Sequence, residues 1–400
     1  MKILLVSDYG TLAGGAEVQL IGLRDELRSR GHDARLFSSS ARMKTAVSQT
    51  DYECFGTLSS FRTIVQTANP SAYHHLRRVL TEFKPDVVHV KLFLTQLSPL
   101  ILPLLRKVPS IYYVAWYRPI CPLGTKMLPD GSHCRVRAGV PCLSNGCLPL
   151  RDWAPIMFQM KLWRRWRGAF RMVVANSEAT RRALVAEGID VSAVVLHGTR
   201  VRESRRQLSP SPTVSFAGRL VPEKGVDVLL HAFVRIAHEL PEARLIIAGD
   251  GPQRDAMQRL MAELGLESRV TMTGYLPREV LEQTCEAAWV QAVPSRWAEP
   301  FGVVAVESMM RGRAVVGTMG GGLSEIIREG ETGYLVPPGD VQSLGEALLT
   351  VLRDRAVAER MGETARSDAM LRFSQSTFAD RLLELYQQAI TSEVRAHDAA

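Results

Sequence analysis

The sequence predicts an α/β protein built from two parallel-sheet domains, and three observations lead to this prediction. The chain has 400 residues, which is about the length of two ordinary domains. Short apolar runs alternate with helical patterns along both halves, as they do in βαβ units. A polar stretch with two prolines and four arginines, residues 198–212, separates the two series and is typical of a linker.

The predicted elements of the first half follow from its apolar runs. A strand over residues 3–6 precedes a turn at Gly14 and Gly15, and the apolar spacing over 16–27 predicts a helix. Further strands are expected at 34–37, 86–90, 111–114 and 172–175. We assign residues 1–197 to an N-terminal domain.

The second half repeats this scheme over residues 213–375, which we assign to a C-terminal domain. Strands are expected at 213–218, 244–248, 270–273, 290–293, 314–317 and 333–336, with a helix over 226–240. The last helical pattern, within 376–400, has an apolar face and is expected to pack back on the N-terminal domain. Because open parallel sheets bind ligands beyond the carboxyl ends of their strands, we expect a site in a cleft between the domains.

Composition excludes several classes of protein. Hydrophobic residues make up 46% and charged residues 22%, which is ordinary for a globular protein and argues against disorder. No uninterrupted apolar run reaches the ~18 residues of a spanning helix. The apolar run at the N-terminus is too short for a signal peptide, so we expect a cytoplasmic protein.

Charge is divided unevenly along the chain. The first 200 residues carry 27 basic and 14 acidic side chains, whereas the last 200 carry 22 and 27. This asymmetry predicts an anionic partner for the first half, either a membrane or a nucleic acid; the alternative is a solvated surface without a partner. No known nucleic-acid module accompanies it, so we expect no nucleic acid.

Residues 161–171 combine five cations with three aromatic side chains. Trp163, Trp166 and Phe170 share one face of a helix and arginines flank them. This pattern is typical of a helix that lies on an anionic membrane surface, and it predicts a peripheral protein on the inner face of the membrane. The alternative is that the aromatic face packs beneath the strand at 172–175.

The segment from Glu299 to Glu307 follows an apolar strand and carries two carboxylates separated by seven residues. A helix beginning near Gly302 would direct its free N–H groups toward an anion. The two carboxylates would accept hydrogen bonds from the hydroxyls of a ribose or a hexose. The alternative is an exposed acidic helix start, stabilised by the helix dipole.

Arg219 and Lys224 lie at another strand-to-helix junction of the same half. A guanidinium fork and an ammonium suit a diphosphate, although loop cations are often only solvated. Gly14 and Gly15, which open the first helix of the other half, are expected to touch the same phosphates. The G-x-G-x-x-G spacing of a dinucleotide turn is absent, which argues against a nicotinamide enzyme.

Taken in order, six segments resemble the motifs of glycosyltransferase family 4, or glycosyl transferase group 1: residues 14–17, 218–225, 248–252, 274–276, 299–307 and 320–325. The resemblance implies the GT-B fold, with two Rossmann-like domains whose parallel sheets face a central cleft. It implies a hexosyl-type glycosyltransferase that moves a sugar from a UDP- or GDP-sugar to a glycan, lipid-linked or small-molecule acceptor. The family transfers with retention and requires no metal or other cofactor for transfer.

The resemblance also implies roles for single residues. Arg219 and Lys224 would hold the donor diphosphate and stabilise the leaving group, Glu299 would contact the donor sugar, and Glu307 would contact the ribose. The other donor-binding positions would act through their backbone, at the sugar and phosphate for Phe301, Gly302 and Val303, and at the base for Tyr275 and Leu276.

Two positions depart from the family pattern. Many relatives have a histidine that touches the donor sugar where this chain has Ala115, and an asparagine where it has His197. Ala115 motivates an alternative, a homologue that binds a sugar nucleotide without transferring the sugar. A further alternative is a sugar-nucleotide epimerase of the same fold, which the Glu-x7-Glu pattern disfavours.

Four of the six cysteines lie within 27 residues, in a loop rich in proline, glycine and aspartate: Cys121, Cys134, Cys142 and Cys147. Four thiols in one loop of a cytoplasmic protein favour a structural metal site, with zinc as the expected ion, over a disulfide. The spacings lack the paired C-x2-C units of common zinc sites. Packed free thiols are the third alternative.

Overall fold

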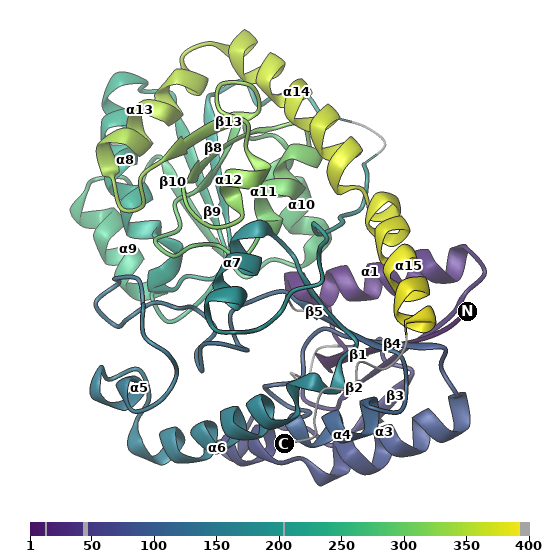
Figure 1. The fold of residues 1–400 in the computed structure, drawn as a ribbon. Coiled ribbons are helices and arrows are strands. Elements are labelled where there is room, and N and C mark those ends of the chain that lie inside the picture. The colour runs from purple at the N-terminus through teal and green to yellow at the C-terminus, as the bar shows by residue number, and fades with distance from the viewer. Residues whose placement is uncertain (13, 43–46, 203–204, 393–400) are drawn as a thin grey trace. The chain divides into compact units, whose positions relative to one another are not determined.

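The computed structural model of the protein describes residues 1–12, 14–42, 47–202 and 205–392. The chain divides into two compact units (Figure 1), one of Met1–Gly198 with Gln375–Ala400 and the other of Thr199–Ser374. The described part of the expected linker packs with the second unit, because Leu208 is buried and the Ser209 amide donates to the Ala287 carbonyl at 2.8 Å. Residues 203–204 of that stretch, and 393–400 of the expected final helix, lie outside the described residues.

The first unit is built on a parallel sheet, whose order over the described residues is β3-β2-β1-β4-β5-β6-β7. Its strands are β1 (Lys2–Tyr9), β2 (Asp33–Ser39), β3 (Tyr52–Cys54), β4 (Val87–Val90), β5 (Ser110–Val114), β6 (Met172–Ala175) and β7 (Ala193–Val194). The sequence pattern did not predict β3 and β7, because each is too short to show a period. The chain runs outward from β1 to β3 and then crosses to β4, so the strand order reverses between β1 and β4.

Helices cover both faces of the first sheet, since side chains alternate along each strand. On one face Ile3 and Leu5 of β1 join a buried cluster with Leu23 of α1 and with Phe378 and Leu382 of α15. Helix α15 therefore completes this unit although it comes last in the chain. The helices are α1 (Gly15–Ser29), α2 (Arg62–Thr67), α3 (Pro70–Phe83), α4 (Leu102–Leu105), α5 (Pro141–Ser144), α6 (Leu150–Trp166), α7 (Glu178–Ala186) and α15 (Gln375–Thr391), with 3-10 turns at Pro99–Ile101 and Arg167–Ala169.

Two of the three aromatic side chains of residues 161–171 point into the protein, which confirms for these two the alternative that the aromatic face packs inside rather than on lipid. Trp163 is buried and its indole N–H donates to the Pro119 carbonyl at 3.0 Å. Phe170, also buried, stacks on Tyr112 with ring centroids 5.1 Å apart. Burying large aromatic surfaces against strand β5 is strongly favourable, whereas Trp166 and the basic side chains of this segment remain partly or fully exposed. Within the described ranges, no helix combines the length and hydropathy needed to cross a membrane.

The second unit is built on another parallel sheet, with the order β10-β9-β8-β11-β12-β13 among the described residues. Its strands are β8 (Thr213–Ala217), β9 (Arg244–Ala248), β10 (Val270–Gly274), β11 (Val290–Val293), β12 (Ala314–Thr318) and β13 (Gly333–Val336). Each strand predicted for this half is present. The order again reverses once, here between β8 and β11.

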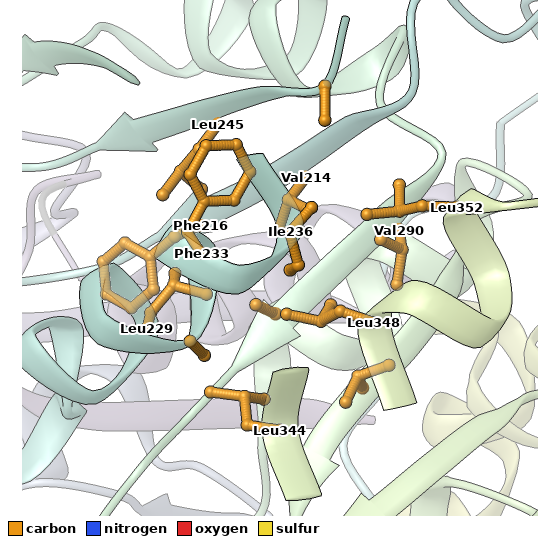
Figure 2. Close-up of a cluster of buried hydrophobic side chains, with 14 of the residues drawn as sticks. Val214, Phe216, Leu229, Phe233, Ile236, Leu245, Val290, Leu344, Leu348 and Leu352 are labelled. Carbon is orange, nitrogen blue, oxygen red and sulfur yellow. The ribbon is translucent and has the colours of Figure 1, made fainter. Parts of the chain in front are cut away.

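Two sets of helices sandwich the second sheet. Figure 2 shows Val214, Phe216 and Leu245 packed with Phe233 of α8 and Leu348 of α13 on one face. The next residues along the same strands, such as Ala217 and Ala248, face α10 and α11 on the other side. The helices are α8 (Val226–Glu239), α9 (Arg254–Glu263), α10 (Arg278–Glu286), α11 (Val303–Met310), α12 (Leu323–Ile326), α13 (Val341–Leu352) and α14 (Arg355–Phe373), with a 3-10 turn, η3, at Pro222–Lys224.

Candidate functional site

The reversal of strand order between β8 and β11 brings two predicted motifs together. Lys224 ends the η3 turn after β8, and Glu299 lies in the loop after β11. The Lys224 ammonium is 2.6 Å from Oε1 of Glu299, which also accepts a hydrogen bond of 2.6 Å from the hydroxyl of Ser295. Residues 75 positions apart in the chain thus form one ion pair at the carboxyl edge of the sheet, where such folds bind ligands.

The ion pair is largely enclosed, since Glu299 is only 5% exposed. Burial by itself would raise the pKa of Glu299, but the Lys224 charge and hydrogen bonds from Lys224, Ser295 and Trp297 outweigh it and lower the pKa. The Lys224 ammonium also lies 5.2 Å from the centre of the Trp297 ring. Glu299 is therefore held as an ionised acceptor, which suits contact with sugar hydroxyls.

Arg219 follows β8 directly and is exposed. Its guanidinium has no ion-pair or hydrogen-bond partner among the described residues, so it is available to an anion. The loop that carries it is held by backbone contacts, because the Gly218 amide donates to the Ala248 carbonyl at 3.0 Å and the Leu220 amide donates to the Asp250 carbonyl at 2.9 Å.

Glycines allow these loops to approach one another. A Cβ on Gly249 would lie 1.8 Å from the Gly218 carbonyl oxygen, and one on Gly225 would lie 2.1 Å from the Pro294 carbonyl oxygen. Gly225 also has a φ of 64°, which disfavours other residues. The positions of Arg219 and Lys224 thus depend on backbone contacts that no larger residue permits.

Helix α11 begins at Val303, one residue after the predicted start at Gly302. Gly302 has a φ of 115° and precedes the helix, whose first-turn N–H groups have no acceptors within the helix. The side chain of Phe301 is buried against Phe373, so only its backbone faces the site region. The Glu299 carbonyl accepts from the Gly322 amide at 2.7 Å, which ties this loop to the one after β12.

Glu307 lies in α11, close to the base-side residues expected after β10. Its carboxylate is 3.2 Å from the guanidinium of Arg278, and burial raises its pKa although Arg311 and Arg278 oppose that shift. Tyr275 is 65% exposed, whereas Leu276 packs against the small cluster beneath α10. The second unit therefore holds five predicted donor-binding positions besides Lys224 and Glu299, namely Tyr275, Leu276, Gly302, Val303 and Glu307.

Gly14 and Gly15 belong to the first unit, at the start of α1. Gly14 has extended backbone, and a Cβ there would lie 2.3 Å from a carboxylate oxygen of Glu17. Ala115, at the end of β5, packs against the cluster under α1 and α15. Its methyl group offers no hydrogen-bonding atom, so this edge lacks the imidazole that the family pattern places there.

Two charged residues that sequence reasoning missed lie at the point where the first sheet reverses its order. Asp8, in β1, is buried and accepts hydrogen bonds of 2.7–2.9 Å from the amides of residues 95–97. Lys91, directly after β4, is fully buried, donates to Oε1 of Gln19 and lies 5.5 Å from the centre of the Tyr113 ring. A charged residue at the end of an apolar strand was the signal that could have identified both.

Burial lowers the pKa of Lys91 to about 7, although the Glu17 carboxylate acts in the opposite direction. An unfolded lysine keeps its pKa of 10.5, so between about pH 7 and 10.5 the unfolded state binds more protons. We expect the stability of the protein relative to a Lys91→Met variant to rise with pH over this window, by at most about 1.4 kcal/mol per pH unit. Thermal unfolding of both proteins near the two ends of the window measures this. A difference that does not vary with pH would contradict the lowered pKa.

Comparisons with known proteins agree with this geometry. Residues 13–200 match the family described as Glycosyltransferase Family 4, and residues 200–368 match the family described as Glycosyl transferases group 1. The chain is 32% identical over 184 residues to an alpha-D-kanosaminyltransferase of Streptomyces kanamyceticus, covering 46% of this chain and 47% of that protein. It is 37% identical over 242 residues to a D-inositol 3-phosphate glycosyltransferase of Nocardia farcinica, covering 56% and 53%. These matches span about half the length of each relative.

Solved structures show the same fold over nearly the whole chain. Sucrose-phosphate synthase from Thermosynechococcus elongatus superposes with a TM-score of 0.73 at 21% identity, covering 98% of this chain and all of that one (100%). Anabaena HepE, in complex with UDP-glucose, superposes with a TM-score of 0.70 at 22% identity, covering 97% and 100%. These likenesses establish a GT-B fold, as the resemblance implied. The chain therefore belongs to the GT-B glycosyltransferases of family 4, glycosyl transferases group 1.

Proposed function

We propose that the protein transfers a hexosyl-type sugar from a nucleoside diphosphate sugar to an acceptor. The observation that carries this proposal is the ion pair between Lys224 and Glu299. It joins the cation proposed to bind the diphosphate to the carboxylate proposed to bind the sugar, at the point where the strand order of the second sheet reverses. Arg219, after the end of β8, adds a guanidinium that has no partner within the described ranges. The likeness to a UDP-glucose complex supports a sugar nucleotide as donor.

In this proposal the diphosphate leaving group is stabilised by the chain's own cations. Negative charge develops on the leaving phosphate as the glycosidic bond to it breaks, and Arg219 and Lys224 supply positive charge there. The N-terminus of α11 and its preceding Gly302 add backbone N–H groups. This arrangement supports transfer without a divalent metal, and the family resemblance supports retention of configuration at the sugar.

The base of the donor distinguishes two forms of this proposal, a UDP-sugar and a GDP-sugar. UDP appears in the names of four solved structures, three of Anabaena HepE and one of S. aureus TarM, whereas a relative from Mycolicibacterium smegmatis, 34% identical over 192 residues, is named GDP-mannose-dependent. Gly14 and Gly15 of the first unit are proposed to touch the donor phosphates as well. The acceptor is proposed to bind to the first unit.

A binding and turnover assay tests the proposal. One of UDP and GDP is expected to raise the melting temperature of the protein, and its hexose conjugate is expected to release nucleotide slowly in the presence of a chelator. Arg219→Ala should weaken nucleotide binding about tenfold to a hundredfold, since a charge-assisted hydrogen bond contributes about 1.5–3 kcal/mol. Binding of neither nucleotide, or equal binding by the variant, would contradict the proposed donor site.

A second candidate function rests on Ala115. The carboxyl edge of β5 offers a methyl group in place of an imidazole, which favours a homologue that binds the donor without transferring its sugar. The same assay separates the two functions. Nucleotide binding with no release, with or without candidate acceptors, would favour the second.

We further propose that the first unit docks on an anionic membrane surface, as a peripheral protein of the inner face. Every third or fourth residue of α6 is exposed, and this face presents Arg151, Phe158, Lys161 and Arg165. Helix α2, which packs beside α6, presents Phe61 and Ile64, which are 68% and 63% exposed. Exposed apolar rings among cations suit anionic lipid, and the aromatic residues buried beneath α6 are not needed for this contact.

Sedimentation with vesicles of phosphatidylglycerol and phosphatidylcholine tests this surface. Lys161→Ala with Arg165→Ala is expected to weaken binding about tenfold or more, at about 1 kcal/mol per cation. The matched control, Arg77→Ala with Arg78→Ala on α3, removes the same charge from another exposed helix and should have a smaller effect. Equal losses in both double variants, or no binding by the wild type, would contradict the proposed surface.

A further inference from the structure

The four cysteines of the loop after β5 line one hollow. The hollow is small, since the space within it that a water-sized molecule can enter is only about 20 Å3. Besides the thiols of Cys121, Cys134, Cys142 and Cys147, the lining is almost entirely apolar, with Lys126 as its one ionisable side chain in the described structure. Thiols converge here from three separate parts of the loop, and no carboxylate or imidazole of a described residue lines the space between them.

Hydrogen bonds and an ion pair hold the loop in place and thereby fix the positions of these thiols. Residues 126–134 form a tight hairpin, in which the Cys134 amide donates to the Lys126 carbonyl at 2.8 Å and Gly131 supplies a φ of 86° at the turn. The Lys126 ammonium is anchored by Glu187 at 2.8 Å and by the Val136 carbonyl at 3.0 Å. Cys142 lies on α5 (Pro141–Ser144), and the Leu148 amide donates to its carbonyl at 3.0 Å.

We propose that these four thiols bind a metal centre as thiolates. An all-sulfur donor set of four selects zinc or an iron–sulfur cluster over the hard cations that oxygen ligands hold. The Lys126 amide already donates to Sγ of Cys121 at 3.4 Å, which is the kind of contact that orients and tunes a thiolate ligand. All six cysteines are free thiols in the described structure, so none of the four is committed to a disulfide.

The two forms of metal centre differ in the space they need. Zinc holds sulfur at about 2.3 Å, so one ion would require the thiols to close on the hollow. As the described part of the chain stands, no three histidine, cysteine, aspartate or glutamate side chains are placed to hold a single ion. A four-iron cluster, which takes one thiolate at each iron, is larger than one ion, so the apolar side chains that line the hollow would have to move outward to admit it.

The Lys126 ammonium also lines the hollow, where it would offset part of the negative charge that four thiolate ligands bring to a metal centre. The loop also packs on Trp116, since a Cβ on Gly124 would lie 2.8 Å from that ring. The centre would therefore brace the segment that follows Ala115 at the carboxyl edge of the first sheet.

Metal analysis of the full-length protein, purified without oxygen, tests the proposal independently of the proposed transferase activity. We expect about one zinc ion, or about four iron atoms with as much acid-labile sulfide, per chain. The second result would be accompanied by the visible absorption of an iron–sulfur cluster. Cys134→Ser and Cys147→Ser should each reduce the metal content at least tenfold. Cys54→Ser and Cys285→Ser, which replace buried cysteines outside the loop, are the matched controls and should retain it.

Two results would overturn the proposal. One is a wild-type protein that holds neither metal after incubation with zinc, or with iron and sulfide under reducing conditions. The other is metal that both loop variants retain. Titration of free thiols in denaturant identifies a disulfide, whose presence in the metal-free wild type would also count against a metal centre. The metal content of the wild-type protein decides the question by itself, so the proposal remains testable even if the loop variants do not fold.

Discussion

Lys224→Ala is expected to lower the rate of sugar transfer, or of donor hydrolysis in the absence of acceptor, about 100- to 1,000-fold. The ammonium would stabilise charge that develops on the leaving diphosphate, and removing one preorganised group of this kind costs about that factor. Glu299→Gln should have a comparable effect, because it removes the negative charge that holds Lys224 in place at 2.6 Å. Steady-state rates of nucleotide release, measured at saturating donor, check both variants.

Three comparisons separate catalysis from folding in this experiment. Arg235→Ala breaks an ion pair with Glu346 at 3.0 Å elsewhere in the second unit and should leave the rate within about twofold. The double variant of Lys224 and Glu299 should lose less than the product of the single losses, because the two side chains are in contact. Lys224→Arg should restore part of the rate if charge is what matters. A Lys224→Ala protein that is folded and fully active would contradict the assigned role.

Gly249→Ala is expected to destabilise the second unit by about 3 kcal/mol or more. The added Cβ would lie 1.8 Å from the Gly218 carbonyl oxygen, and both partners are backbone held by neighbouring strands, so neither can move away cheaply. For a unit of this size, the loss corresponds to a fall of about 6–12 °C in melting temperature. Differential scanning calorimetry measures it, and the variant should also bind nucleotide more weakly, since Gly218 adjoins Arg219.

Gly265→Ala is the matched control for this substitution. Gly265 has a φ of 65°, but a Cβ there meets nothing within 4 Å. It therefore reports the cost of backbone strain alone, about 1 kcal/mol. If the two variants were equally stable, the close approach of the loops after β8 and β9 would not be a constraint on the site.

Much of the fold could be predicted from the sequence, because buried parallel strands appear in it as short runs of apolar residues. The runs at 213–218 and 290–293 correspond to β8 and β11, and Gly302 marks the start of α11 to within one residue. Short elements escaped prediction for the same reason, since β7 has two residues and carries no period. The periodic pattern also described the aromatic face at 163–170 correctly but left open whether protein or lipid covers it.

Candidate residues for the site could be chosen from the sequence, but their contacts could not. Arg219, Lys224 and Glu299 were chosen from residue type and from their places after strands. Their pairing depends on the order of strands in the sheet, which no local pattern encodes. Asp8 and Lys91 were missed because a charged residue at the end of an apolar strand is a weak signal, and the residues that contact each of them lie far away in the chain.

The sequence by itself determined the alternation of strands and helices, the order of the motifs and the family to which they belong. Only the tertiary structure decided which of these residues meet. The reversal of strand order between β8 and β11 pairs Lys224 with Glu299. Trp163 packs inward against β5, and the folding of the loop that includes the hairpin at 126–134 brings four thiols around one hollow. The physical reason is that local patterns report how each segment buries its apolar side chains, whereas charges and ligands are brought together by contacts between segments distant in the chain.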